Sequence, residues 1–172
     1  MYKRQVSDDF TITSVLKEAK LPIHFTPNCL VASAGDCDVR ELLEFTTRQI
    51  KITRVYASHL WLALLLGSAL FALAFFGGII LLILSNSLVV AVFLLVIFAL
   101  GAAKSFIRFR AVSTVLQTST LDLLAHVFLW PFASLLYLYN AIAAGFSRRI
   151  KWRGITYELK SPTEAVIISR ES

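Results

Sequence analysis

The centre of the chain is almost entirely apolar. Residues 55–103 contain no Asp, Glu, Lys or Arg, and the only polar triplet in this run is the Ser-Asn-Ser at 85–87. A helix needs about 20 apolar residues to cross the hydrocarbon core of a bilayer. The uncharged run therefore predicts two membrane helices, near 58–83 and 88–103, joined by a turn at the polar triplet.

Two helices with mixed apolar and polar positions are predicted before this run. In 9–20 the apolar residues recur at mostly helical spacing, and we interpret Asp8 and Asp9 as its cap and dipole partners. A second helix is expected at 38–56, because Asp38 is followed three residues later by a glutamate, the pattern of a capping box. Its alternation of apolar and cationic residues suits a helix lying on a membrane surface.

The remaining patterned segments are short and strand-like. Residues 23–26 and 30–33 resemble edges of a sheet whose remainder lies outside this chain. The tail alternates over 150–159 and again over 165–169, which predicts a β-hairpin with a bulge at Gly154. A hairpin of this size is not stable alone, so we expect it to pack on another element, and the fragmentary sheet at 23–33 is one candidate.

The segment after the uncharged run mixes apolar and cationic residues. Residues 104–120 suit an interfacial helix, and 121–146 is apolar but interrupted by Pro131 and by central aromatic residues. A third crossing would put the cations of 148–153 on the opposite side from those of 104–110, against the positive-inside rule. We therefore expect 121–146 to bend at Pro131 and return as interfacial or re-entrant short helices.

Composition agrees with a membrane protein of one domain. The 172 residues are 57% hydrophobic and 16% charged, with a net charge of +6. Most Lys and Arg flank the apolar segments, where they face lipid headgroups and mark the cytoplasmic side, so the charge does not indicate a nucleic-acid partner. Cys29 and Cys37 lack ligand spacing, so we expect no metal site. Both ends of the chain are expected in the cytoplasm.

Four motifs occur in a fixed order around the predicted membrane hairpin: Ser-Asp-Asp-Phe at 7–10, Ile-His-Phe-Thr-Pro at 23–27, Arg-Gln-Ile-Lys at 48–51, and Lys-Trp-Arg-Gly-Ile-Thr-Tyr-Glu-Leu at 151–159. With this order the chain, over residues 6–170, resembles the C-terminal half of ceramide glucosyltransferase-like enzymes. These are glycosyltransferases of the GT-A fold that move a sugar from a nucleotide donor to a lipid.

The resemblance implies catalysis by Asp9 and contacts to the acceptor or the diphosphate by Arg48, Gln49 and Asp8. Asp9 matches the catalytic base, with Asp8 in place of the family's usual Glu. Arg48 matches the arginine of a (Gln or Arg)-x-x-Arg-Trp motif that contacts the acceptor and the diphosphate, while Phe45 and Gln49 stand where the motif has its first residue and its Trp. The alternative readings are helix capping for the two aspartates and a headgroup-facing cation for Arg48. The resemblance further implies a divalent cation, Mg or Mn, for the full-length enzyme and none in this fragment.

The expected fold class is a membrane α-helical hairpin with interfacial helices, attached to a partial α/β (GT-A) region and a C-terminal β-hairpin. The expected parts are residues 1–5, which resemble a translated sequencing adapter, the C-terminal part of a GT-A catalytic domain at 6–56, the transmembrane hairpin at 57–103, interfacial or re-entrant helices at 104–146, and a cytosolic tail at 147–172.

The resemblance predicts the acceptor-side and membrane half of an inverting glycosyltransferase. The full-length enzyme would bind a nucleotide-sugar, with glucose as the expected sugar, and a membrane lipid acceptor that is ceramide-like, a hopanoid or another polyisoprenoid-type lipid. This fragment would lack the donor-binding half and be inactive alone. The alternative is a complete small membrane protein that acts as a non-catalytic scaffold or assembly subunit.

Overall fold

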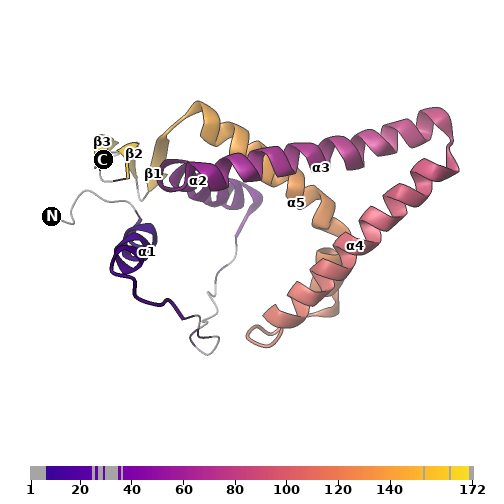
Figure 1. Ribbon diagram of the computed structural model, residues 1–172, viewed down its shortest axis with the longest axis horizontal. Coiled ribbons are helices and arrows are strands. Elements are labelled where there is room, and N and C mark those ends of the chain that lie inside the picture. Colours follow the sequence, from indigo (N-terminus) through magenta and orange to yellow (C-terminus); the bar gives the residue numbers. More distant parts are fainter. Residues whose placement is uncertain are drawn as a thin grey trace. The chain divides into compact units, whose positions relative to one another are not determined.

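The computed structural model describes residues 7–24, 26, 29, 35, 37–152, 154–162 and 164–170. The elements in chain order are α1 (Asp8–Glu18), α2 (Val39–Tyr56), α3 (Ser58–Ser85), α4 (Leu88–Val112), α5 (Thr120–Phe146), β1 (Arg149–Trp152), β2 (Ile155–Ser161) and β3 (Glu164–Arg170) (Figure 1). They form two compact units. The sheet unit holds α1, α2, α3 up to Leu64, α5 from Tyr139 and the three strands, and the helical unit holds residues 65–138.

Helix α1 begins one residue earlier than predicted and has a different cap. The Ser7 hydroxyl oxygen accepts the backbone N–H of Phe10 at 3.5 Å, so Ser7 is the N-cap. The prediction that Asp8 or Asp9 caps the helix is therefore wrong. Both aspartates lie in the first turn, where a negative charge still favours the positive end of the helix dipole.

Helix α2 is confirmed with the predicted cap. The Asp38 carboxylate accepts the backbone N–H of Glu41 at 2.7 Å, and the Glu41 carboxylate accepts that of Asp38 at 3.3 Å. This capping box satisfies two donors that a helix start leaves unpaired. It fixes where α2 begins, and thereby which of its residues face the sheet.

The tail forms a three-stranded antiparallel sheet in the order β1-β2-β3, one strand more than a simple hairpin. Gly154 has a φ of 73° and lies in the turn between β1 and β2, a conformation that glycine adopts without strain. The predicted bulge at Gly154 is therefore misplaced. The register shifts occur within the β2–β3 pairing, between Thr156 and Tyr157 and between Leu159 and Ser161.

The sheet packs on α2. Ile52 of α2, Ile150 of β1 and Leu159 of β2 form a core in which they are 6%, 3% and 1% exposed. Phe10 of α1 packs against this core and stacks on Tyr56 with ring centroids 5.3 Å apart. The core therefore joins α1, α2 and the sheet into one unit.

In the predicted sheet fragment at 23–33 the described residues form no strand, and the core of the tail packs on α2. Residues 23, 24 and 26 have no regular secondary structure, and 30–33 lie outside the described residues. Prolines stand on both sides of 23–26, and each removes a backbone donor that a strand would need. The apolar side of the amphipathic helix α2 packs against the tail instead.

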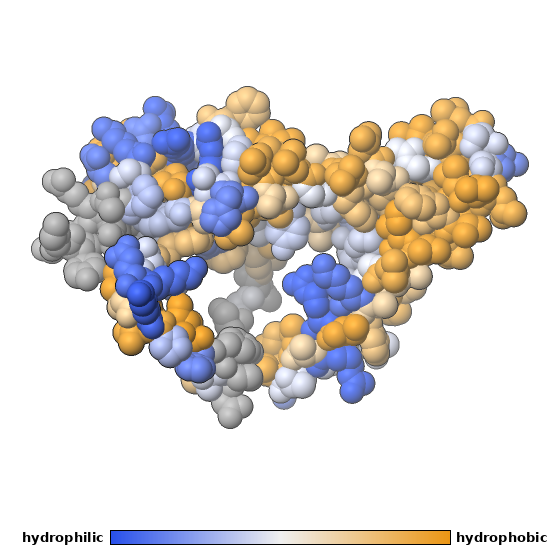
Figure 2. Space-filling model, viewed as in Figure 1, coloured by the Kyte–Doolittle hydropathy of each residue, from blue (hydrophilic) through white to orange (hydrophobic). Residues whose placement is uncertain are grey.

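The two helices of the predicted hairpin are confirmed, and both are long and apolar enough to span a membrane. Helices α3 and α4 have 28 and 25 residues, and the turn between them contains Asn86 with a φ of 46°, in the left-handed region that Asn tolerates. Figure 2 shows hydrophobic side chains over most of both helices and hydrophilic ones at the C-terminal end of α4. Helix α4 continues to Val112, so the interfacial helix predicted to begin at 104 is wrong in its boundary. Lys and Arg are good helix formers with long side chains that can reach headgroups, so they do not end a helix.

Helix α5 is one continuous helix of 27 residues with Pro131 inside it, so the predicted pair of short helices is wrong. A proline removes one backbone hydrogen bond, and the apolar residues on both sides still favour a helix. The Ser134 hydroxyl donates to the carbonyl of Pro131 at 2.5 Å. By length and composition α5 is, with α3 and α4, one of three helices in the described chain that could span a membrane.

Aromatic side chains hold the helical unit together. The Trp130 ring of α5 lies 5.2 and 6.0 Å from Phe71 and Phe75 of α3 and 6.1 Å from Phe98 of α4 (centroid distances). The Trp130 ring also lies against Gly101, where a Cβ atom would collide with it. Trp130 is therefore a packing residue, which explains its position in the middle of an apolar segment.

We expect Gly101→Ala to destabilise the helical unit by about 1–3 kcal/mol, because the added methyl group would displace the Trp130 ring. Gly67→Ala is the matched control, since a Cβ there has no neighbour within 4 Å and alanine favours a helix by up to about 1 kcal/mol. Thermal unfolding in detergent, followed by tryptophan fluorescence, measures both. Equal melting temperatures for the two variants would contradict the packing described here.

Candidate functional site

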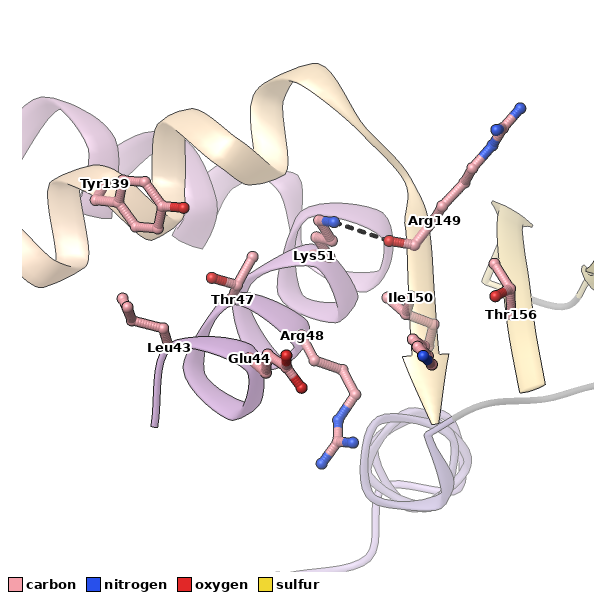
Figure 3. A pocket seen from close by; sticks show the side chains of 10 residues that line it. Leu43, Glu44, Thr47, Arg48, Lys51, Tyr139, Arg149, Ile150 and Thr156 are labelled. Atoms are coloured by element: carbon pink, nitrogen blue, oxygen red, sulfur yellow. Dashed lines mark hydrogen bonds between the residues drawn. The ribbon is translucent and has the colours of Figure 1, made fainter. Parts of the chain in front are cut away.

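A cavity of about 380 Å³ lies in the sheet unit between α2, the end of α5 and the sheet. We call it the cationic cleft (Figure 3). Helix α2 supplies residues spaced three or four apart, so they share one side of the helix. The lining residues are Leu43, Glu44, Thr47, Arg48 and Lys51 of α2, Tyr139 of α5, Arg149, Ile150 and Lys151 of β1, and Thr156 of β2.

The charges around the cleft are mostly positive. Arg48, Lys51, Arg149 and Lys151 line it, against the single carboxylate of Glu44. Glu44 itself forms an exposed ion pair with Arg40, with 3.1 Å between Oε1 and Nε. Such an excess of cations attracts an anion, and guanidinium and ammonium groups are the usual partners of phosphate and diphosphate oxygens.

Lys51 connects α2 to the sheet. Its ammonium group donates to the backbone carbonyl of Arg149 at 2.8 Å, as the dashed line in Figure 3 marks. Partial burial lowers the pKa of Lys51 below its usual value, because the charged form loses hydration. An anion in the cleft would favour the charged form again, so binding and protonation of Lys51 reinforce each other.

The Arg48 side chain points away from Lys51 and lines two cavities (Figure 3). Its guanidinium carbon lies 5.4 Å from the centre of the Phe45 ring, in cation–π contact. Besides the cationic cleft, Arg48 lines a neighbouring cavity of about 160 Å³ together with Gln49 and Trp152. The structure thus brings Arg48 and Gln49 to one small cavity, while Gln49 is absent from the described lining of the cationic cleft.

Asp9 lies apart from both cavities. It is exposed in the first turn of α1, and it is not among their described lining residues. Its neighbour Phe10 attaches α1 to α2 by stacking on Tyr56. Asp8 occupies the same turn. The catalytic role assigned to Asp9 and the contact assigned to Asp8 stay predictions.

Thr47 gives the cleft an oriented hydroxyl. It donates to the amide oxygen of Asn140, 2.7 Å away, and Asn140 is fully buried. Because the hydroxyl hydrogen is used in this bond, the oxygen of Thr47 is left to accept from a group in the cleft. The Asn140 amide nitrogen has no hydrogen-bond partner among the described residues.

The last turn of α5 is fastened beside the cleft. Arg54 of α2 donates to the Ala144 carbonyl at 2.5 Å, and the Trp61 indole N–H of α3 donates to the Ala141 carbonyl at 2.9 Å. Arg54 also lies over the Trp61 ring at 5.1 Å. Ala144 is among the last four residues of α5, whose carbonyls lack an intrahelical partner, so Arg54 satisfies one of them. Arg54 and Trp61 hold the end of α2, the start of α3 and the end of α5 together.

The described residues contain no group of three His, Cys, Asp or Glu side chains that could hold a metal ion. Cys29 and Cys37 are free and exposed. The described lining of the cationic cleft offers mainly cationic and hydroxyl groups.

The sequence did not predict that cations from α2 and β1 line the same cavity. Lys51 and the cations near 149–151 were interpreted as headgroup contacts, whereas the structure places them with Arg48 around one cavity. One signal was available: Arg48 and Lys51 are three residues apart on a helix, and Arg149 and Lys151 are two apart on a strand, so each pair shares a face. The pairing of α2 with β1 that joins the two faces was not visible in the sequence.

Comparison with known proteins identifies the family. A family model described as glycosyl transferase family 21, the ceramide glucosyltransferase family, matches residues 2–165. No curated protein and no solved structure gave a significant match. The matched range covers nearly the whole chain, including the cationic cleft and all three apolar helices. The chain therefore belongs to glycosyl transferase family 21, whose activity is sugar transfer to lipids.

Proposed function

We propose that this chain forms the acceptor-side and membrane part of an inverting glycosyltransferase that moves glucose from a nucleotide-sugar to a ceramide-like membrane lipid. Family membership and the three apolar helices support this proposal. The observation that carries it is the cationic cleft, which lies between α2, the end of α5 and the sheet.

The cleft suits the leaving group of the reaction. When the acceptor oxygen bonds to the anomeric carbon, the bond from that carbon to the diphosphate oxygen breaks, and the electron pair stays on the diphosphate. Arg48 and Lys51, with the cations of β1, would stabilise the negative charge that develops there. Charge-assisted hydrogen bonds of this kind are stronger than neutral ones.

Asp9 would act as the general base. The acceptor hydroxyl must lose its proton as it attacks, and a carboxylate within reach can take it. Inversion follows because attack and departure occur on opposite faces of the sugar. Asp9 would act from the first turn of α1, next to Phe10, which holds this helix against Tyr56 of α2.

Donor binding is assigned to a region outside the described residues. All strand pairs described here are antiparallel, whereas the GT-A nucleotide-binding core is built on parallel strands. The divalent cation, Mg or Mn, would belong to that region, where it would neutralise diphosphate charge. The part described here would supply the acceptor path and the cations that receive the leaving group.

The packing of the sheet on α2 constrains the membrane topology. A shared apolar core of Ile52, Ile150 and Leu159 requires α2 and the sheet to lie on the same side of the bilayer. The chain between Tyr56 and Arg149 must therefore cross an even number of times. We infer that α3 and α4 cross, and that α5, as one continuous helix, lies in the cytoplasmic interface of the bilayer without crossing it.

In the full-length enzyme we expect Arg48→Ala to lower kcat/KM by about 10- to 100-fold, because one charge-assisted contact to the diphosphate is lost. Arg40→Ala is the control, since Arg40 pairs with Glu44 on the exposed surface of the same helix and is not among the described lining residues of the cleft. Steady-state transfer of radiolabelled sugar to ceramide in membranes measures both variants. Equal activity of the two variants would show that the cleft takes no part in the reaction. Repeating the assay with hopanoid acceptors distinguishes the classes of lipid acceptor.

We expect Asp9→Asn to reduce kcat by about 10²–10⁴, the usual contribution of a general base, while donor binding stays unchanged. Glu18→Gln, an exposed change at the other end of α1, should leave turnover unaffected. Turnover and nucleotide-sugar binding are measured in parallel in the full-length enzyme. Normal turnover in Asp9→Asn would end the assignment of the base.

A cysteine at Glu164, in a background with Cys29 and Cys37 replaced by serine, should resist a membrane-impermeant thiol reagent in intact cells and react after permeabilisation. A cysteine at Ser85, at the end of α3, should react in intact cells. Reaction of the Glu164 cysteine from outside would show an odd number of crossings and refute the topology.

A further inference from the structure

A second cavity, of about 340 Å³, lies entirely within the helical unit, between α4 and α5. We call it the α4–α5 cavity. Ser105 and Arg108 line it from α4, three residues apart, and His126, Trp130 and Tyr137 line it from α5. These spacings place each set along one side of its helix. No residue of this cavity takes part in the cationic cleft.

Two contacts shape the cavity. The Trp130 ring reaches in beside Gly101 because that position has no side chain, which brings α4 and α5 together at one end. The His126 ring packs on Phe109 with centroids 5.5 Å apart, and Phe109 is buried. The two rings are thereby held in place, so the polar groups of the cavity are arranged before any ligand binds.

The polar groups of the cavity are mainly hydrogen-bond donors. Arg108 contributes a guanidinium, Ser105 and Tyr137 contribute hydroxyls, and no carboxylate is among the described lining residues. The indole nitrogen of Trp130 is buried and has no hydrogen-bond partner among the described residues. An N–H of this kind costs free energy unless something accepts it. A group rich in acceptors, with negative charge, would satisfy these donors together.

The rest of the lining is apolar. Leu129 with Ala125 and Ala133 completes the wall on α5. A small hydrophilic anion would leave this wall in contact with water, whereas a lipid would place its headgroup at Arg108 and its glycerol and first methylenes along the apolar wall. Lys104 and Arg110 flank Arg108 at the same end of α4, as expected for a helix end at headgroup level.

We propose that the α4–α5 cavity binds one membrane phospholipid, with its phosphate held by Arg108 and the Trp130 indole N–H. The lipid would fill the gap between α4 and α5 and complete the packing of the helical unit. The inference does not rest on the proposed transfer reaction, because it concerns different residues and a lipid that is not consumed.

Native mass spectrometry of the delipidated protein in detergent tests the proposal. The probes are phosphatidylglycerol, the diacylglycerol with the same acyl chains, and glycerol phosphate. We expect the unaltered protein to retain one phosphatidylglycerol in preference to the other two. Arg108→Ala should weaken that binding about tenfold or more, as loss of a charge-assisted contact would.

Arg110→Ala is the matched control, because Arg110 lies two residues away on the same exposed helix end and does not line the cavity. It should bind phosphatidylglycerol like the unaltered protein. Circular dichroism should be the same for both variants, since Arg108 is exposed and its loss leaves the helix intact. Trp130→Phe, which keeps a ring but removes the N–H, should also weaken binding.

Three results would overturn the proposal. Equal weakening by Arg108→Ala and Arg110→Ala would show general attraction to a charged helix end. Equal retention of diacylglycerol would show an apolar groove without a phosphate site. Binding of glycerol phosphate as strong as that of phosphatidylglycerol would show a site for a soluble phosphate.

Discussion

The packing of α2 against the C-terminal sheet is the constraint on which the rest of the structure depends. Ile52 is separated from Ile150 and Leu159 by about a hundred residues of chain, most of it in the three apolar helices, yet the three residues share one buried core. A hydrogen bond from Lys51 to the Arg149 carbonyl reinforces the junction, and one from Arg54 to the Ala144 carbonyl attaches α2 to the end of α5. Apolar burial supplies most of the stability, and the polar contacts fix the register.

This junction also creates the cationic cleft. Helix α2 places its apolar residues toward the sheet, so Arg48 and Lys51 fall at the rim, where β1 adds its own cations. Four like charges near one cavity repel each other. An anion bound in the cavity attracts all four and makes their grouping favourable. The core thus holds together charges that would otherwise separate, as expected of a site prepared for a diphosphate.

The sequence was informative where local chemistry decides the structure. The uncharged run with one polar triplet predicted the α3–α4 hairpin, and Asp38 with Glu41 predicted the start of α2. Predictions from the sequence were wrong or incomplete where the structure depends on contacts between residues distant in sequence. Pro131 predicted a break, but a helix tolerates the loss of one hydrogen bond. The partner of the tail and the gathering of cations depend on the contact between α2 and β1, which no local pattern reveals.

Family membership and the cationic cleft both indicate binding of a diphosphate leaving group. Amine labelling in the presence of inorganic pyrophosphate tests this binding most directly. Lys51, whose lowered pKa makes its amine more reactive, and Lys151 would be acylated in the purified chain and counted by mass spectrometry. The account predicts that pyrophosphate slows labelling of these two lysines and leaves Lys17 and Lys20 of the α1 region unchanged. Equal labelling rates at all four lysines with and without pyrophosphate would contradict it.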